Sequence, residues 1–327
     1  MKIFDTDCVS KVGEKALIAR VCEILGDVCP PSPYGSGDDC ALIDKKSLSE
    51  NVYATVDSVI AGRHFDLSTP AELVAEKLLK RNISDIAAMG ARPESALSCA
   101  IVSDNLSLSW LETFTKSLAE TARSYGIKIV GGDFSSAGVD NFFSMSLTLL
   151  GSSDLPALLR ASADEGEYIY CTGKLGYSYL SGKHLTFEPK LRQGQWLAQW
   201  NCNGADFAKI TSCTDISDGL AFDIENILSR NTKAVISYLP QNQWQGKTSV
   251  DESLCGGEDY ELLFSLSATE SQATEFENAY FEKFSEPVYR IGIVQKKELS
   301  EESSLYLNLE GSLSAFTKRG FEHFKKS

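Results

Sequence analysis

The chain has 327 residues, of which 43% are hydrophobic and 23% charged, an ordinary globular composition and enough length for two domains. Its formal net charge is −14 at pH 7, so we expect neither nucleic acid nor an anionic membrane as a partner. No apolar run reaches the ~18 residues of a membrane helix, and residues 1–15 lack the apolar core of a secretory signal, so we expect a cytoplasmic protein.

Cysteine and histidine usage narrows the kinds of site that the chain is expected to build. Nine cysteines occur without a C-x-x-C pair, which argues against a disulfide framework and against a zinc ribbon. Cys99 and Cys171 lie in apolar, strand-like runs and are expected to be small core residues. Because the chain has only three histidines, a histidine-rich transition-metal site is also disfavoured.

Periodicity in the first half predicts alternating strands and helices, which favours a mixed α/β fold. A helical pattern over 68–93 has its start marked by Thr69 and its end by Gly90. Ser109 and Glu112 have the spacing of a capping box for a second helix. The predicted order is a strand over 51–60, the first helix, a strand over 96–102, the second helix over 107–126, and strands over 127–133 and 142–151.

The strand pattern of the sequence is interrupted between Gly151 and Gly166 by a polar connection. We therefore place a domain boundary near residue 152, which gives an N-terminal domain over 1–151 and a C-terminal α/β domain over 152–327. In the second domain we expect a strand near 168–171, a helix near 190–200, and strands over 260–267 and 288–294.

Acidic residues recur where a strand ends or a loop meets a helix. For any single turn, ordinary turn chemistry is the better explanation of Asp and Gly, but the recurrence over five turns favours a site. Two carboxylates ~4 Å apart repel by about 4 kcal/mol at an effective dielectric of roughly 20, and a divalent cation removes that repulsion. Oxygen ligands favour Mg²⁺ or Mn²⁺ over zinc. The turns predicted to converge on a divalent-metal and phosphate site contain Asp38 with Asp39, Asp57, Asp85, Asp133, and Asp215 with Asp218.

Lys77, Arg81 and Asp85 share one face of the first helix, because they are four residues apart. Such a stripe is either a solvated row of ion pairs or a row that contains a half-buried carboxylate. The packed run IAAMGA directly after Asp85 favours the second interpretation.

Two glycine turns, at 130–136 and 172–178, offer backbone N–H groups that can approach phosphate oxygens, with a plain tight turn as the alternative for each. Neither is a P-loop, since the chain has no G-x-x-x-x-G-K-[ST] pattern. Arg160 either meets a phosphate or is an ordinary surface arginine, and the residues around it leave both open.

Several motifs occur in a fixed order along nearly the whole chain. They are GDDCAL (37–42), TVDSVIAGRHF (55–65), RNISDIAAMGARP (81–93), VGGD (130–133), TGKLGYS (172–178), DISDGLAFD (215–223), GGEDYELLF (256–264) and GFEHF (320–324). Each motif alone is weak. Together they resemble the thiamine-monophosphate kinases, of the aminoimidazole-ribonucleotide-synthetase-like ATP-using superfamily.

The resemblance implies an N-terminal α/β domain whose strands form a barrel across a homodimer, and a C-terminal α/β domain that covers the cleft. It implies transfer of a phosphoryl group from ATP to the phosphate of thiamine monophosphate, with several Mg²⁺ ions. By matching positions, the resemblance implies that the metal ligands are Asp39, Asp57, Asp85, Asp133, Asp215 and Asp218, with an added oxygen from Thr55, and that the catalytic acids are Asp39, Asp85 and Asp218. It implies that the nucleotide contacts are Gly132, Asp133, Arg160 and Ser217. The contacts to the thiamine end that it implies are His64, Glu258 and Phe321.

The chain departs from the family pattern in ways that leave the acidic positions in place. The departures are Phe134 after the GGD segment, Val56 in TVD, Ala161 and Ser162 after Arg160, the segment TFEPK with Thr186 and Lys190, and Asn226 where a histidine is usual.

Other functions stay open at this point. One is a different reaction of the same superfamily, which makes selenophosphate or an aminoimidazole ribonucleotide. A selenophosphate enzyme needs a reactive N-terminal cysteine, and Cys8 lacks the glycine-rich setting expected for it. Another is a non-catalytic nucleotide-binding or scaffold protein, which an ATP-binding assay paired with a turnover assay distinguishes from an enzyme.

Overall fold

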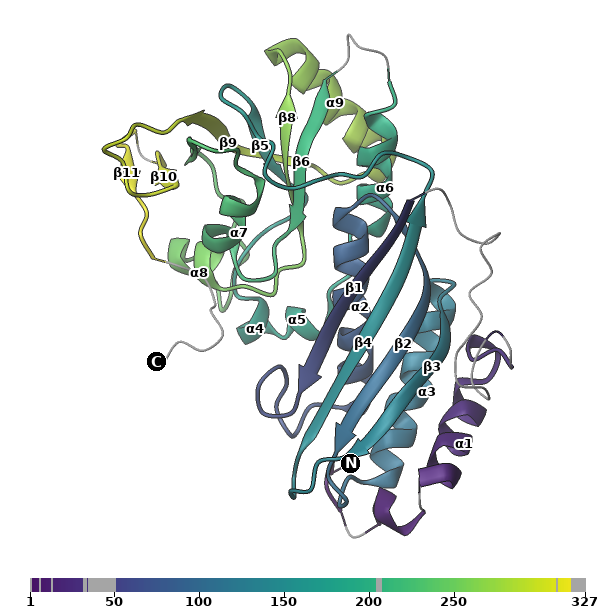
Figure 1. Ribbon diagram of the computed structural model, residues 1–327. Helices are drawn as coiled ribbons and strands as arrows, with labels where there is room; N and C mark the ends of the chain where they lie inside the picture. The colour runs from purple at the N-terminus through teal and green to yellow at the C-terminus, as the bar shows by residue number, and fades with distance from the viewer. Residues whose placement is uncertain are drawn as a thin grey trace. The chain divides into compact units, whose positions relative to one another are not determined.

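The computed structural model describes residues 2–5, 7–12, 14–31, 34, 51–203, 208–309 and 311–318. The chain divides into two compact units (Figure 1): Met1–Ile86 with Arg92–Asp154 form unit 1, and Ala87–Ala91 with Leu155–Ser327 form unit 2. The short segment Ala87–Ala91 belongs to unit 2, although it precedes the predicted boundary near residue 152 in the sequence.

Unit 1 contains an open four-stranded sheet in the order β1-β4-β2-β3, so β1 and β3 are its edge strands. The β1–β4 and β4–β2 pairs are antiparallel, and β2–β3 is parallel. The alternating strand predicted over 51–60 is confirmed residue for residue. Its elements are η1 (Val9–Lys11), α1 (Glu14–Leu25), η2 (Gly26–Val28), β1 (Asn51–Ile60), α2 (Ala71–Ala88), β2 (Arg92–Val102), α3 (Leu108–Ser124), β3 (Lys128–Ser136) and β4 (Phe143–Ser153).

The sheet of unit 1 has one face packed under helices and one open face. Phe143 of β4 contacts Trp110 and Phe114 of α3 in edge-to-face geometry, so α3 covers the face that Phe143 shares with the buried Val59. Apolar side chains also line the opposite face, where they are exposed: Val52 (52%), Val56 (61%), Leu97 (43%) and Ile101 (43%). Cys99 is exposed there too, so the prediction that it is a core residue is wrong. Alternation along β2 places it on the open side.

The predicted cap of the second helix is wrong by two residues. Helix α3 begins at Leu108, and its N-cap is Ser107, whose hydroxyl accepts the N–H of Trp110 at 3.3 Å. The start is fixed earlier than the Ser109 prediction because a segment far away in the sequence holds the chain there. Ser107 N–H donates to the Ile3 carbonyl at 2.7 Å, and Leu108 N–H donates to the Asp7 carbonyl at 3.1 Å.

Unit 2 is a mixed seven-stranded sheet in the order β11-β10-β7-β9-β5-β8-β6, with helices on both faces. Cys171 of β5 packs with α7 and α8 in one buried cluster, whereas its neighbour Tyr170 packs with α6 and α9 in another. Cys171 is therefore the core residue that the sequence predicts. The elements are β5 (Tyr168–Cys171), α4 (Ser178–Ser181), α5 (Lys183–Thr186), α6 (Leu191–Trp200), β6 (Lys209–Asp215), α7 (Leu220–Ile227), β7 (Thr232–Ile236), α8 (Val250–Cys255), β8 (Leu262–Ser267), α9 (Glu270–Phe284), β9 (Tyr289–Lys296), β10 (Leu305–Leu307) and β11 (Ser314–Ala315).

The helices of the described residues differ from membrane-spanning helices. None of them combines the length and the apolar character that crossing a bilayer demands.

Candidate active site

Two polar pairs join β1 to α2 in unit 1. The Thr55 hydroxyl donates to Asp85 Oδ2 at 2.5 Å, and Arg81 Nη2 lies 3.1 Å from Asp57 Oδ1. Thr55 and Asp57 alternate onto one face of the strand, and Arg81 and Asp85 lie one turn apart on the helix, so the two pairs are neighbours. Asp85 is half-buried, which confirms the interpretation that this helix face is not a solvated stripe.

These pairs supply oxygen donors of the kind that magnesium prefers. Thr55, Asp57 and Asp85 offer hydroxyl and carboxylate oxygens on adjacent positions of one strand–helix contact. Within the part of the chain that the structure describes, no group of three or more His, Cys, Asp or Glu side chains is gathered closely enough to hold a metal ion. Mg²⁺ commonly takes one or two carboxylates and completes its shell with phosphate oxygens and water, so the donor set fits that ion.

Asp133 does not join Asp57 and Asp85 within one chain. It lies on β3, at the sheet edge opposite β1, three strand spacings or roughly 14 Å away. Register links Asp133 through Cys99 and Ser146 to Ser58, so the Asp133 side chain shares the open face, whereas Asp57 faces α2. Within one chain, Asp133 therefore does not lie in the same cluster as Asp57 and Asp85. Its role as a metal ligand stays a prediction.

Gly132 next to Asp133 has a local structural requirement. A Cβ at this position would lie 2.3 Å from the Ser98 carbonyl oxygen on the paired strand, which no side chain tolerates. The glycine is thus explained by close packing of β3 on β2, and its predicted contact with a nucleotide stays a prediction.

His64 lies in the turn that follows β1. Its Nδ1 accepts the N–H of Ile60 at 3.0 Å, and the buried Lys77 ammonium donates to the His64 carbonyl at 2.8 Å. Because Nδ1 is an acceptor, the neutral ring carries its proton on Nε2 and presents that nitrogen as a donor. The turn is held from two sides, so the ring direction is set by the fold.

In unit 2, one buried carboxylate shapes the loop between β6 and α7. Asp223 Oδ2 accepts the backbone N–H groups of Ser217 at 3.0 Å and Asp218 at 2.9 Å. Burial raises the pKa of the Asp223 carboxyl to about 7, while the nearby charge of Arg160 acts in the opposite direction. Asp223 therefore holds the acidic loop in place, a role that the sequence prediction missed although the residue stands in the same motif.

The departure at Asn226 has a structural explanation. Its side-chain Nδ2 donates to Asp223 Oδ1 at 3.3 Å, and its backbone carbonyl accepts the N–H of Ala161 at 2.8 Å. Ala161 adopts a left-handed conformation with φ of 62°, directly after Arg160. Asn226 thus connects the acidic loop to the chain beside Arg160, so Arg160 lies near the loop that carries Ser217 and Asp218.

Glu258 is placed beside the same loop by its backbone. Its N–H donates to the Ser217 carbonyl at 2.7 Å, and Tyr260 N–H donates to the Ile216 carbonyl at 2.8 Å. Asp215, at the end of β6, is buried with only 2% of its surface exposed. Unit 2 therefore assembles one group of the predicted residues: Arg160, Asp215, Ser217, Asp218 and Glu258.

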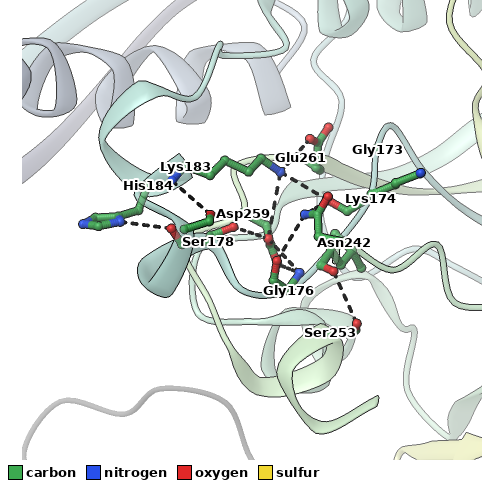
Figure 2. Close-up of polar contacts among 12 residues, drawn as sticks. Gly173, Lys174, Gly176, Ser178, Lys183, His184, Asn242, Ser253, Asp259 and Glu261 are labelled. Carbon is green, nitrogen blue, oxygen red and sulfur yellow. Dashed lines mark hydrogen bonds and ion pairs between the residues drawn. The ribbon is translucent and has the colours of Figure 1, made fainter. Parts of the chain in front are cut away.

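The phosphate interpretation of the 172–178 turn is wrong for two of its N–H groups. Leu175 N–H donates to the Pro240 carbonyl, and Gly176 N–H donates to the Asp259 carboxylate at 3.0 Å (Figure 2). Gly176 has φ of 92°, and a Cβ there would lie 2.8 Å from Ser253 Cα. The glycine is needed for close packing, and its N–H is already occupied within unit 2.

Other predicted positions have plainer outcomes. Val56 lies on the open face of β1, so the hydroxyl that this departure removes would not have faced Asp85. Lys190 pairs with Glu261 at 3.3 Å, and Phe134 is half-buried on β3. Asp39 and Phe321 lie outside the described residues.

Known proteins similar to this chain agree on a family. Residues 37–153 match the family model described as AIR synthase related protein, N-terminal domain. The chain is 33% identical to a thiamine-monophosphate kinase from Escherichia coli O157:H7, over 78% of this chain and 82% of that protein. The fold resembles AaThiL complexed with AMPPCP and TMP, with a TM-score of 0.69, 24% identity, and coverage of 97% of this chain and 98% of that one.

The fold is shared more widely than that family. It also resembles the hydrogenase maturation protein HypE of E. coli, with a TM-score of 0.71 and 16% identity over 94% of this chain and 98% of that one. A fold of this kind supports more than one named activity, so the fold alone does not identify the reaction, whereas the sequence relationship and the site residues bear on it.

Proposed function

Because the chain belongs to the thiamine-monophosphate kinase family, we propose that it transfers the terminal phosphoryl group of ATP to the phosphate of thiamine monophosphate, forming thiamine diphosphate and ADP. The relationship over most of both chains is the observation that carries this proposal. The similar fold of AaThiL with AMPPCP, an ATP analogue, and TMP supports ATP and thiamine monophosphate as the two substrates.

The residue types of the site suit this reaction. The acceptor is itself a phosphate oxyanion, so no side chain has to remove a proton from it. What the protein must do is bring two anions together in line and offset their repulsion. Asp57, Asp85, Asp215 and Asp218 are the acids proposed to hold Mg²⁺ ions, which when bound neutralise the phosphate oxygens of donor and acceptor. The Asp223 hydrogen bonds keep the Asp218 loop from rearranging as charge accumulates.

The remaining assignments are part of the same proposal. Asp85 and Asp218 are two of the acids proposed to be essential for transfer. Thr55 adds a hydroxyl oxygen next to Asp85. Asp39 is the third catalytic acid and Asp133 a further metal ligand; Gly132, Asp133, Arg160 and Ser217 are assigned to the nucleotide; and His64, Glu258 and Phe321 are assigned to the thiamine end.

The open face of unit 1 supports a homodimer. Val52, Val56, Leu97 and Ile101 form an exposed apolar surface, and β1 and β3 are the edge strands of the sheet within the described ranges. A second copy of this sheet would bury those side chains and pair the edges, giving the barrel that the family resemblance implies. The test compares Val56→Glu with Val139→Glu, since both valines are 61% exposed but Val139 lies outside the sheet. Sedimentation should show dissociation for Val56→Glu only, and two unchanged dimers would contradict the interface.

The activity is tested directly with purified protein, ATP, MgCl₂ and thiamine monophosphate, followed by chromatography of the products. We expect thiamine diphosphate and ADP in equal amounts, and no product when EDTA is present or when unphosphorylated thiamine replaces the monophosphate. A folded protein that binds AMPPCP but makes no diphosphate would reject this function and favour a non-catalytic nucleotide-binding protein.

A further inference from the structure

The segment that carries Glu258 is strained along its backbone. Gly257, Glu258 and Tyr260 have φ of 65°, 55° and 52°, so two residues with side chains adopt the left-handed region within three positions. Each such residue costs on the order of 1–3 kcal/mol and persists only when surrounding contacts over-determine it. The contacts that hold this turn therefore decide whether Glu258 keeps its place.

On one side, the turn is held by the acidic loop through main-chain bonds. Glu258 N–H reaches the Ser217 carbonyl at 2.7 Å, and Tyr260 N–H reaches the Ile216 carbonyl at 2.8 Å. Both bonds come from residues with left-handed φ, so they fix the strained residues themselves.

On the other side, one buried side chain ties the turn to the loop 173–178. Asp259 has only 1% of its surface exposed, and its carboxylate lies between Gly176 and Ser178 (Figure 2). Gly176 N–H donates to Oδ1 and Oδ2 at 3.0 and 3.2 Å, and the Ser178 hydroxyl donates to Oδ1 at 2.5 Å. Three donor contacts on one buried carboxylate form a charge-assisted connection that neutral groups would not match.

The loop 173–178 is itself anchored elsewhere in unit 2. Asn242 Nδ2 donates to the Lys174 carbonyl at 3.0 Å and to the Gly176 carbonyl at 3.1 Å, and the Ser253 hydroxyl donates to the Leu175 carbonyl at 3.3 Å. A loop fixed in this way is a rigid support for Asp259 and not a mobile partner.

The charge of Asp259 is balanced without making it an exposed ion pair. Lys183 Nζ lies 4.0 Å from Asp259 and 3.2 Å from Glu261, and Lys190 lies 3.3 Å from Glu261. Two carboxylates and two ammonium groups thus share one partly buried cluster. Replacing Asp259 by Asn leaves both lysines paired with Glu261, so the variant has a physical reason to fold.

Building on the proposed function, we infer that Asp259 is a positioning residue for binding thiamine monophosphate: it ties the loop 173–178 to the strained turn and so holds Glu258 in place. Asp259 acts through the turn and touches no substrate. Its loss should loosen the Gly176 connection and weaken the binding of thiamine monophosphate, while the binding of the nucleotide changes little.

The experiment uses Asp259→Asn and the milder Ser178→Ala, with Glu282→Gln as a control because Glu282 is exposed on α9. Hydrogen exchange of the Gly176 amide should become at least ~10-fold faster in Asp259→Asn and several-fold faster in Ser178→Ala. The dissociation constant for thiamine monophosphate, measured by calorimetry, should rise about 10-fold while that for AMPPCP stays within about two-fold.

Two results would overturn the inference. One is an unchanged Gly176 exchange rate in Asp259→Asn, which would show that the carboxylate does not hold the loop. The other is an equal loss of affinity for both ligands, which would indicate a general structural role. Neither readout depends on turnover, so a failure of the kinase assay and a failure of this inference remain distinguishable. If the wild-type protein does not bind thiamine monophosphate at all, the proposed function fails and the inference falls with it.

Discussion

Two acids between β1 and α2 and two buried acids of unit 2 are used in different ways. Asp57 and Asp85 are half-buried on regular secondary structure, where Arg81 and Thr55 side chains contact them. Asp223 and Asp259 are almost fully buried and accept backbone N–H groups of neighbouring loops. The first kind of acid keeps oxygen atoms near solvent, where the proposed metal ion can reach them, and the second kind uses its oxygen atoms to shape the chain.

This difference shows that a motif can contain both kinds of acid only a few residues apart. Asp218 and Asp223 stand in one motif, yet Asp223 accepts the N–H of Asp218. A substitution that removes a ligand should reduce turnover and leave stability alone. A substitution that removes a loop support should lower stability as well.

The largest expected effect is that of Asp85→Asn on turnover. The amide keeps the size of the side chain and an oxygen that accepts from Thr55, but it removes the charge proposed to hold Mg²⁺. We expect kcat to fall by at least about 100-fold, equivalent to roughly 3 kcal/mol of transition-state stabilisation. Asp140→Asn, an exposed acid in the β3–β4 connection, is the control and should retain full activity. Near-normal turnover of Asp85→Asn at saturating Mg²⁺ would remove Asp85 from the site.

Asp218 and Asp223 offer the sharpest contrast within one loop. Asp218→Asn should lower kcat by about 100-fold while the free energy of unfolding stays within about 0.5 kcal/mol of wild type. Asp223→Ala should instead lower the free energy of unfolding by about 2–4 kcal/mol, because two partly buried N–H groups lose their buried acceptor. Urea unfolding monitored by fluorescence measures the free energy of unfolding of both variants. Equal destabilisation by the two substitutions would erase the proposed division of roles.

The pH dependence of stability tests the buried kind of acid at Asp259. Burial raises the pKa of its carboxyl from 3.8 to about 6, with the charge of Lys183 acting in the opposite direction. Between pH 4 and 6 the folded state then binds more protons than the unfolded state, so this group makes the free energy of unfolding fall as the pH rises. This loss of unfolding free energy is absent below about pH 4 and complete above about pH 6, where it amounts to roughly 3 kcal/mol.

Asp259→Asn isolates that contribution. The variant has no carboxyl to titrate, so its stability relative to wild type should improve by up to about 3 kcal/mol between pH 4 and pH 7. Urea titrations at half-unit pH steps, with EDTA present throughout, measure this difference. Parallel curves for the two proteins would mean that the Asp259 pKa is not raised in the folded state.

Much of the fold follows from patterns that are local in the sequence. The strand over 51–60 alternates on every residue, and the end of α2 is marked by Gly90, whose φ is 71°. Helix α9 was missed although Thr269 and Gln272 form a capping box with the expected spacing, so a local signal was present. The N-cap of α3 is Ser107 and not the predicted Ser109, because Ile3 and Asp7, about a hundred residues earlier, hold the chain there.

The candidate site was predictable as a set of residue types but not as an arrangement. Motif order proposes Asp57, Asp85 and Asp218 as site residues, because acids that recur in several spaced motifs form a recognisable pattern. Burial is not readable from that pattern, so the loop-holding roles of Asp223 and Asp259 were missed. The sheet order, which puts Asp133 at the edge opposite Asp57, results from long-range pairing and has no local signal.

The smallest effect is expected from Thr55→Val, which separates a supporting hydroxyl from a metal ligand. Valine keeps the β-branched shape that suits β1 and removes only the hydroxyl that donates to Asp85. If Thr55 only orients that carboxylate, kcat should fall about 10-fold with a nearly unchanged Mg²⁺ dependence, because a hydrogen bond to a charged acceptor is worth about 1.5 kcal/mol at the lower end of its usual range and Asp85 keeps its charge. Thr55→Ser restores the hydroxyl and should recover most of the rate. If Thr55→Val instead loses as much activity as Asp85→Asn and needs far more Mg²⁺, the Thr55 hydroxyl is itself a metal ligand. Thr55 and Asp85 would then not differ as a supporting residue and a ligand.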